Sequence, residues 1–271
     1  MTHTRNIPQS FWRDERLPWL ELRSTWRSRQ PYKRHCHPQL SVGAILEGET
    51  CCIYDGKAYR LQVGDLIVIP PEVPHSCNPV DGHCRSYHML YLDADWCLTQ
   101  LTEADAGMRL SAPDPVIRNP LLFQHYLEIV TLMEQQQTTQ LADAVGTLLR
   151  VLPLQSAEPD DPRATSRYLR ERLVSNLLSP PSLDALAQEF GIRKETLIRT
   201  FKQDTGLTPG CYLNIARLDY ARERLRAGEE IADVGYQSGF ADQSHFHRTF
   251  VTYTAATPRQ YASGRSISDN K

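Results

Sequence analysis

The C-terminal third of this chain contains an internal repeat. When the residues around 183–212 are compared with those around 231–261, matching residues lie 48 or 49 positions apart. The matched pairs include Leu186 with Val234, Gly191 with Gly239, Leu197 with Phe246, Arg199 with Arg248, Phe201 with Phe250, and Thr208-Pro209 with Thr257-Pro258. A repeat of this length, with apolar residues, glycines and an arginine in register, predicts two copies of one supersecondary unit.

Each copy has the pattern of a helix-turn-helix. In the first copy a short apolar stripe ends at Phe190, Gly191 permits a turn, and Leu197 with Phe201 resumes a helical face. If Leu197 and Phe201 face inward, the outer face carries Lys194, Glu195, Ile198, Arg199 and Lys202. The outer face of the second copy carries Gln243, Ser244, His245, His247 and Arg248.

Those outer faces are rich in side chains that read DNA. Arginine can bind guanine, glutamine can bind adenine, and serine can bind either. A solvated helix face would also be polar, but the arginine at the same place in both copies favours DNA binding. Between the copies, residues 209–226 form an 18-residue helical pattern, about 27 Å long. A rigid spacer of this size can hold two recognition helices in major-groove segments roughly one turn, about 34 Å, apart.

The stretch from Ser182 to Tyr261 resembles the DNA-binding domain of the AraC/XylS family of bacterial transcription regulators. The resemblance rests on IADVGYQSGFADQSHFHRTF followed by TPRQY. It implies that the residues that approach bases are Glu195, Ile198 and Arg199 in the first copy and Gln243, Ser244, His247 and Arg248 in the second. The sequence departs from the family pattern at Ala255, where glycine is usual, at Arg193, where a small capping residue is usual, and at Val251 and Ala262, where basic residues are usual.

Length and charge divide the chain. A chain of 271 residues is expected to hold about two domains. Residues 1–161 carry 14 Lys and Arg against 20 Asp and Glu, whereas residues 162–271 carry 16 against 12, so the positive charge lies with the repeat. Residues 153–162, PLQSAEPDDP, are proline-rich and acidic, which predicts a linker between residues 1–152 and 163–271.

Composition also bears on location. No apolar run reaches membrane length and the N-terminus lacks a signal-peptide core, so we expect a cytoplasmic protein with no membrane partner. Seven cysteines, an odd number without a paired framework, agree with reduced thiols, although a thiol switch stays open.

Short strands and tight turns are predicted from Pro31 to Asp93. Residues 40–46, 50–54, 58–61, 66–69 and 86–92 have strand patterns, and Asp55-Gly56 predicts a hairpin turn. Together with HCHPQ and VGDLIVIPPEVPHS they resemble the cupin-like sensor domain of AraC-type regulators. The predicted fold class is α+β: an N-terminal cupin-like antiparallel β-barrel with flanking helices and a C-terminal all-α tandem helix-turn-helix domain.

The resemblance implies that the barrel interior binds an effector. Alternation along a strand puts His35, His37 and Gln39 on one face, and His75 and Cys77 on one face. Cupin enzymes hold a metal with a His-x-His pair, a Glu and a later His. His35, His37 and His75 match three of these places, so zinc or another divalent metal is a candidate cofactor. The Glu place is not filled, although Gln39 lies nearby and Cys77 could substitute as a thiolate ligand. The histidines could instead bind an organic ligand or pack at the barrel mouth.

Two helical stripes follow, within residues 120–135 and 141–152. They could cover the barrel, or one could also form the seam of a homodimer.

We therefore expect an effector-responsive transcription regulator that binds promoter DNA, and RNA polymerase if it activates, and that is not an enzyme. A cupin metalloenzyme with a DNA-binding tail is the main alternative, and a DNA-binding protein whose barrel only dimerises is another.

Overall fold

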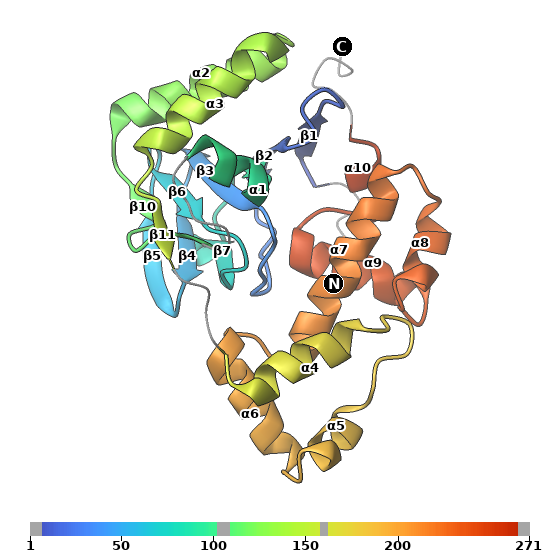
Figure 1. Cartoon of the computed structure of the whole chain (residues 1–271). Coiled ribbons are helices and arrows are strands. Elements are labelled where there is room, and N and C mark those ends of the chain that lie inside the picture. Colours follow the sequence, from blue (N-terminus) through green and yellow to red (C-terminus); the bar gives the residue numbers. More distant parts are fainter. Residues whose placement is uncertain (1–6, 102–108, 158–161, 265–271) are drawn as a thin grey trace. The chain divides into compact units, whose positions relative to one another are not determined.

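The computed structural model describes residues 7–101, 109–157 and 162–264, which form two compact units (Figure 1). One unit is made from most of residues 7–157 and is built on antiparallel sheets. The other includes residues 162–262 and is helical. The predicted α+β class with two domains is confirmed.

The described residues of the N-terminal unit form three antiparallel sheets, together with helices that are given below. The largest has the order β1-β2-β8-β3-β6-β10, with bounds Gln9–Arg13, Leu20–Ser28, Arg85–Leu92, Leu40–Glu47, Leu66–Ile69 and Val116–Ile117. A second has the order β5-β4-β7, with bounds Lys57–Leu61, Thr50–Tyr54 and His75–Pro79. A third pairs β9 (Arg109–Ser111) with β11 (Gln155–Ala157).

The strands predicted between residues 40 and 92 are present, and the predicted hairpin turn is confirmed because Asp55 and Gly56 both have positive φ. Strands β1 and β2 lie before the region where strands were expected. The expected linker also contains a strand, β11, because residues 155–157 find a pairing partner 40 to 50 residues earlier in β9. Residues 158–161 of that linker lie outside the described residues.

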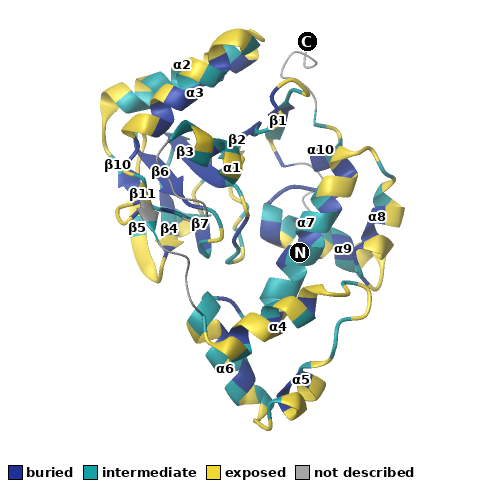
Figure 2. Ribbon diagram, in the orientation of Figure 1, coloured by how far each residue is buried: buried dark blue, intermediate teal, exposed yellow. Residues whose placement is uncertain are grey.

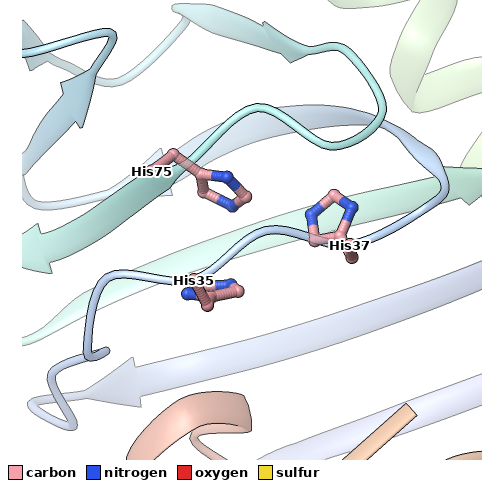
Figure 3. A group of neighbouring side chains, drawn as sticks. All are labelled: His35, His37 and His75. Atoms are coloured by element: carbon pink, nitrogen blue, oxygen red, sulfur yellow. The ribbon is translucent and has the colours of Figure 1, made fainter. Parts of the chain in front are cut away.

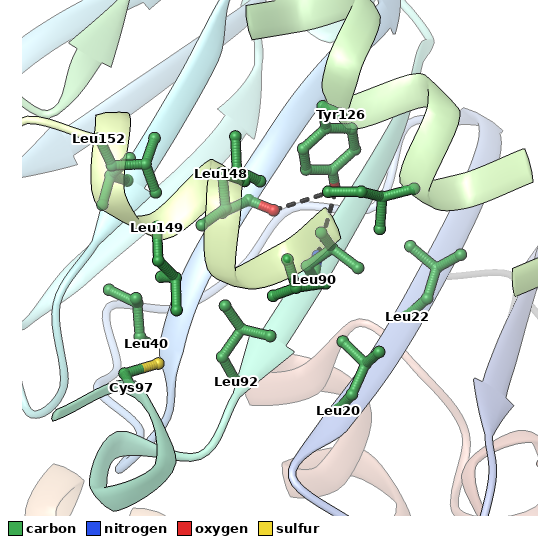
Figure 4. Close-up of a cluster of buried hydrophobic side chains, with 14 of the residues drawn as sticks. Leu20, Leu22, Leu40, Leu90, Leu92, Cys97, Tyr126, Leu148, Leu149 and Leu152 are labelled. Atoms are coloured by element: carbon green, nitrogen blue, oxygen red, sulfur yellow. Dashed lines mark hydrogen bonds between the residues drawn. The ribbon is translucent and has the colours of Figure 1, made fainter. Parts of the chain in front are cut away.

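One face of the large sheet is apolar and is covered by helices. Leu22, Val42 and Leu90 stand in register across three strands and are fully buried. They pack with α2 (Pro120–Glu134), α3 (Thr138–Val151) and α1 (Ala94–Gln100) in one cluster (Figure 4). The buried hydroxyl of Tyr126 on α2 donates to the Val42 carbonyl at 3.0 Å and accepts from the Leu90 N–H at 3.2 Å. The two predicted helical stripes therefore cover the sheet.

The C-terminal unit reproduces the sequence repeat. Helices α5 (Leu183–Glu189) and α8 (Ile231–Gln237) have seven residues each, and α6 (Lys194–Thr205) and α9 (Gln243–Thr254) have twelve each. The spacer is α7 (Pro209–Arg226), with the predicted bounds. Helices α4 (Ala164–Val174) and α10 (Pro258–Ala262) complete the unit, and α4 was not anticipated.

Both copies pack on α7, whose residues Ile215, Leu218, Ala221 and Leu225 are buried. In the first copy Leu197 and Phe201 are buried against Leu169 and Leu173 of α4. In the second, Phe246 and Phe250 are fully buried, with ring centroids 5.6 Å apart. The inward faces predicted for both recognition helices are confirmed, and Figure 2 shows the alternation of buried and exposed residues along these helices.

The two recognition helices differ at their ends. Asp242 caps α9 by accepting from the His245 N–H at 2.7 Å, whereas Arg193 makes no side-chain cap for α6. At the C-terminal ends, Gly206 and its counterpart Ala255 are both left-handed, with φ of 69° and 47°. Alanine adopts this conformation at a cost of roughly 1 kcal/mol or more, so the second copy keeps the same helix ending despite its side chain.

The turn of the second copy is packed more closely than that of the first. Arg217 on α7 donates from Nε and Nη2 to the Leu177 carbonyl at 3.0 and 2.8 Å. A Cβ added at Gly239 would lie 2.1 Å from that carbonyl oxygen and 2.9 Å from Arg217 Nε. A Cβ added at the matched Gly191 would meet no atom of the described structure within 4 Å, its chain neighbours aside. Both glycines have positive φ, so only Gly239 is required by space as well as by backbone conformation.

We predict that Gly239→Ala destabilises α8 and α9 by about 3 kcal/mol or more, because it adds a clash with backbone to left-handed strain. The matched Gly191→Ala should cost only the strain, about 1 to 2 kcal/mol. Hydrogen exchange of α5, α6, α8 and α9 in the full chain measures the local free energy of opening. Equal losses in the two variants would contradict the packing described for the second turn.

Candidate functional site

The predicted DNA-binding residues lie on the open faces of α6 and α9. Glu195, Arg199 and Lys202 are exposed on α6, where Lys194 and Ile198 are half-buried. Gln243, Ser244 and Arg248 are exposed on α9, where His245 and His247 are half-buried. Each helix therefore buries its aromatic or leucine stripe and leaves a polar face accessible, as a helix that enters the major groove must.

Lys194 and His245 also make contacts within the helical unit. The Lys194 ammonium lies 2.9 Å from an Asp184 carboxylate oxygen, so it ties the start of α6 to α5, and the hydrogen bond to Asp184 raises the pKa of Lys194. The His245 ring packs edge-on against Phe240, with centroids 5.4 Å apart. Arg199 and Arg248, by contrast, are exposed at positions 49 residues apart, which is also the separation of the first residues of α6 and α9.

We predict that Arg199→Ala or Arg248→Ala weakens binding to a specific duplex by about 1 to 3 kcal/mol and binding to random DNA much less. The reason is that a bidentate contact to a base edge discriminates sequence, whereas a phosphate contact does not. A duplex selected from a random pool and a scrambled one would be compared by fluorescence anisotropy. Arg150→Ala, at an exposed position of α3, is the control and should leave both affinities unchanged. Equal losses on both duplexes would show phosphate contacts instead.

The second candidate site is the inner face of the large sheet. Directly paired residues share a face, so the register sets Tyr91, Ser41 and Glu21 in one row. Arg23, Met89 and Gly43 form the next row, two residues along each strand. Glu21, Arg23 and Ser41 are all buried. This face opposes β7, because Arg85 from the same side of β8 donates from Nη2 to the Cys77 carbonyl at 2.9 Å.

Charged side chains on this inner face form ion pairs and hydrogen bonds. Glu21 accepts from Arg13 Nε at 2.7 Å, and Arg23 donates to the Gln9 side-chain oxygen at 2.5 Å. The guanidinium of Arg85, 1% exposed, also lies over the Tyr87 ring at 5.2 Å. Charges are almost never fully buried unless they are paired, so a polar lining of this kind marks a face with a purpose beyond packing.

Sequence reasoning missed Glu21, Arg23 and Arg85. The alternation of Leu20, Glu21, Leu22 and Arg23 was a usable signal for a strand with one apolar and one polar face. In an open sheet the polar face would contact water. Here it is covered by the second sheet, and that closure depends on contacts distant in sequence.

Three of the predicted effector residues come together. Nitrogen atoms of His35, His37 and His75, one from each ring, all lie within 4.8 Å of one another (Figure 3). His37 and His75 are buried, and their rings meet edge to face with centroids 4.9 Å apart. The His37 ring also meets Tyr91 on the inner face of the sheet, at 5.5 Å.

Hydrogen bonds fix which nitrogen of each ring is protonated. The Nδ1 atoms of His35, His37 and His75 lie 2.8, 2.9 and 2.8 Å from the carbonyl oxygens of Lys33, Gln39 and Val73. A carbonyl oxygen can only accept, so each neutral ring carries its proton on Nδ1 and its lone pair on Nε2. In His37 that Nε2 accepts from the Ser41 hydroxyl at 3.2 Å.

The other two predicted effector residues lie differently. The side-chain oxygen of Gln39 is buried and has no hydrogen-bond partner among the residues that the structure describes. Cys77 stands two residues beyond His75 on β7, and its thiol contacts Cys52 at 3.1 Å. It is not part of the histidine group, so the suggestion that Cys77 completes a metal-ligand set finds no geometric support among the described residues.

A further buried histidine belongs to the opposite face of the sheet. His88 Nδ1 and the Ser24 hydroxyl share a hydrogen bond of 2.8 Å. Burial lowers the pKa of His88 to about 4, so this ring is neutral at pH 7. Its surroundings explain it as a packed residue of the covered face.

Comparisons with known proteins match two family models to this chain. The model of an AraC-like ligand binding domain matches residues 19–172, more than half of the chain, and a helix-turn-helix domain matches residues 186–264. The HTH-type transcriptional activator RhaS of Escherichia coli is 27% identical in a 249-residue alignment that covers 86% of this chain and 88% of RhaS. The HTH-type transcriptional regulator YbfI of Bacillus subtilis is 26% identical over 232 residues, 80% of this chain and 82% of YbfI.

Solved structures share the fold. An apo form of ToxT from Vibrio cholerae has a TM-score of 0.58 at 13% identity, over 90% of this chain and 97% of ToxT. ToxT with a bound unsaturated fatty acid has a TM-score of 0.54 at 14% identity, over 96% and 97% of the two chains. No helix among the described residues is both long and apolar enough to cross a membrane.

Proposed function

This chain belongs to the AraC family of transcription regulators, and we propose that it binds promoter DNA through α6 and α9 and an effector on the inner face of its sheet. The observation that carries the proposal is the matched pair of twelve-residue helices, each with an exposed polar face, packed on one spacer helix. The proposed base-reading residues are Glu195, Ile198, Arg199, Gln243, Ser244, His247 and Arg248. Lys194, Lys202 and His245 are proposed as flanking contacts.

The effector would act by favouring one arrangement of the chain over another. A ligand with equal affinity for both arrangements shifts nothing, so the effector must bind the DNA-competent state more or less tightly than the other. His37, His75 and Gln39, together with Glu21 and Arg23, supply the donors and acceptors for it. A polar or charged small molecule fits this lining better than a purely apolar one, because buried polar groups need partners.

A divalent metal is the second candidate effector. Metal-bound histidines commonly donate their other ring N–H to a carbonyl or carboxylate, and His35, His37 and His75 all do so. Their Nε2 lone pairs suit zinc, which binds imidazole nitrogen at about 2.0 to 2.1 Å. In His37 the ion would replace the Ser41 hydroxyl at Nε2. The residues therefore fit such an ion in donor chemistry, with water or a ligand in the remaining positions.

An enzymatic role is not proposed. The full-length relatives are named transcription regulators. The histidine group found among the described residues includes no carboxylate, so a ready general base beside a metal is not part of it.

The finer architecture is also a proposal. Because β11 pairs with β9, we extend the effector domain from residue 152 to 157 and begin the DNA-binding domain near residue 163. A homodimer could use the outer surfaces of α2 and α3, where Leu121 and Val151 are exposed. RhaS is named an activator, which supports RNA polymerase as a partner. Because a bacterial promoter lies in the cytoplasm, we also propose a cytoplasmic location.

We predict that an effector found by thermal-shift screening of sugars, carboxylic acids and divalent metals stabilises the full chain but not His37→Ala or Arg23→Gln. These variants remove a ring and a charge from the inner face. Their affinity for effector-free specific DNA should stay within about threefold of the wild type, because α6 and α9 are unchanged. His125→Ala, in the α2 helix, is the control. If His37→Ala lost DNA binding but still bound the effector, the assignment of His37 to the effector site would be wrong.

For the metal, we predict that zinc binding measured by calorimetry weakens at least about 100-fold in His37→Ala and in His75→Ala, since each removes one of three nitrogen ligands. His88→Ala tests specificity, because its imidazole lies on the opposite face. Identical zinc affinity in the wild type and His75→Ala would remove the metal from consideration.

A further inference from the structure

The proposed regulator function leaves one close contact unexplained. Cys52 on β4 and Cys77 on β7 are directly opposite each other in the antiparallel register, and their sulfur atoms are 3.1 Å apart. Both residues belong to the N-terminal unit, and Cys77 shares a face of β7 with His75. Two cysteines at this distance could be joined by a disulfide bond.

We propose that Cys52 and Cys77 are a redox-sensitive thiol pair that forms a reversible cross-strand disulfide. Directly opposed residues of antiparallel strands have Cα atoms about 4.5 or 5.5 Å apart. A disulfide accepts Cα separations of about 4.4 to 6.8 Å. The bond can therefore form by rotation of the two side chains, without a change of strand register.

The neighbouring cysteines do not share this geometry. Cys51 precedes Cys52 and so points to the other face of β4, where its register partner is Asn78. Cys84 lies outside the strands, just before β8. The choice of partners is thus set by the register of β4 and β7, and Cys51 serves as an internal control.

Differences in burial give the order of the chemical steps. Cys77 is half-buried, whereas Cys52 is 0% exposed. The hydrogen bond from Cys77, together with burial, raises the pKa of the Cys52 thiol, which disfavours Cys52 as the first nucleophile. A low-molecular-weight disulfide such as oxidised glutathione therefore meets Cys77 first.

The reaction balances as two exchanges. The Cys77 sulfur, having lost its proton, attacks one sulfur of glutathione disulfide, breaks that S–S bond and releases one glutathione thiolate. The Cys52 sulfur then loses its proton and attacks the Cys77 sulfur of the mixed disulfide, which releases the second glutathione. The two protons from the cysteines end on the two glutathione molecules. The cysteines are oxidised by two electrons and the glutathione disulfide is reduced by two.

The Cys52–Cys77 disulfide would lie close to a proposed effector residue, His75. The Cys77 carbonyl accepts from the buried Arg85 of β8, so β7 is tied to the large sheet at this residue. Oxidation would fix β4 to β7 at the same point, two residues from His75. This consequence rests on the proposed function, whereas formation of the disulfide does not.

The test uses the full chain in glutathione buffers from fully reduced to fully oxidised. Free thiols are blocked by alkylation, and linked peptides are identified by mass spectrometry. We expect oxidised wild type to lose two of its seven free thiols, to contain a Cys52–Cys77 peptide link, and to recover both thiols in dithiothreitol. Cys51→Ser should form the same link.

Cys77→Ser should lose the link and keep its remaining thiols free. Cys77 is half-buried, so its serine variant is the less disruptive member of the pair, and the melting temperature checks its fold. The proposal is overturned if the wild type keeps all thiols free in oxidised glutathione, if Cys77 stops at the mixed disulfide, or if the link joins other cysteines. None of these readouts needs DNA or an effector. The disulfide can therefore be confirmed or refuted whether or not the proposed regulator function is correct.

Discussion

Packing of both helix-turn-helix copies on a single continuous helix is the constraint on which the DNA-binding unit depends. The buried residues Ile215, Leu218, Ala221 and Leu225 lie along α7, which contacts α6 of the first copy and α8 and α9 of the second. Arg217 adds a polar tie from the middle of this helix to the Leu177 carbonyl, at the place where Gly239 leaves room for the second turn. The separation of the recognition helices is therefore fixed by about 27 Å of helix rather than by a flexible loop.

The N-terminal unit depends on a different constraint, the alternation of side chains across one sheet. Leu22, Val42 and Leu90 face the covering helices, and Tyr126 joins two of these strands through its hydroxyl. The residues between them necessarily face the other way. Because a second sheet covers that side, Glu21 and Arg23 are buried together with His37 and His75. We propose that ligand binding and thiol chemistry share this interior.

The sequence was most informative where local signals determine the structure. The bounds of α7 and the inward faces of Leu197 and Phe246 follow from helical periodicity, capping residues and the repeat, and they were predicted. Strands β1 and β2, helix α4 and strand β11 were not, because their place depends on partners far along the chain. For the same reason the sequence could not tell that Arg85 is buried or that Cys77 meets Cys52 rather than the histidines. The roles of the base-reading and effector residues stay predictions.

Hydroxyl-radical footprinting of the full chain on a selected duplex tests the central claim most directly. If the rigid helix α7 holds the recognition helices α6 and α9 at a fixed separation, protection should appear as two patches on one face of the duplex. The centres of these patches should be about 10 base pairs apart. That spacing should be the same on different selected sites. A single protected patch, or two patches whose spacing varies from site to site, would contradict the account.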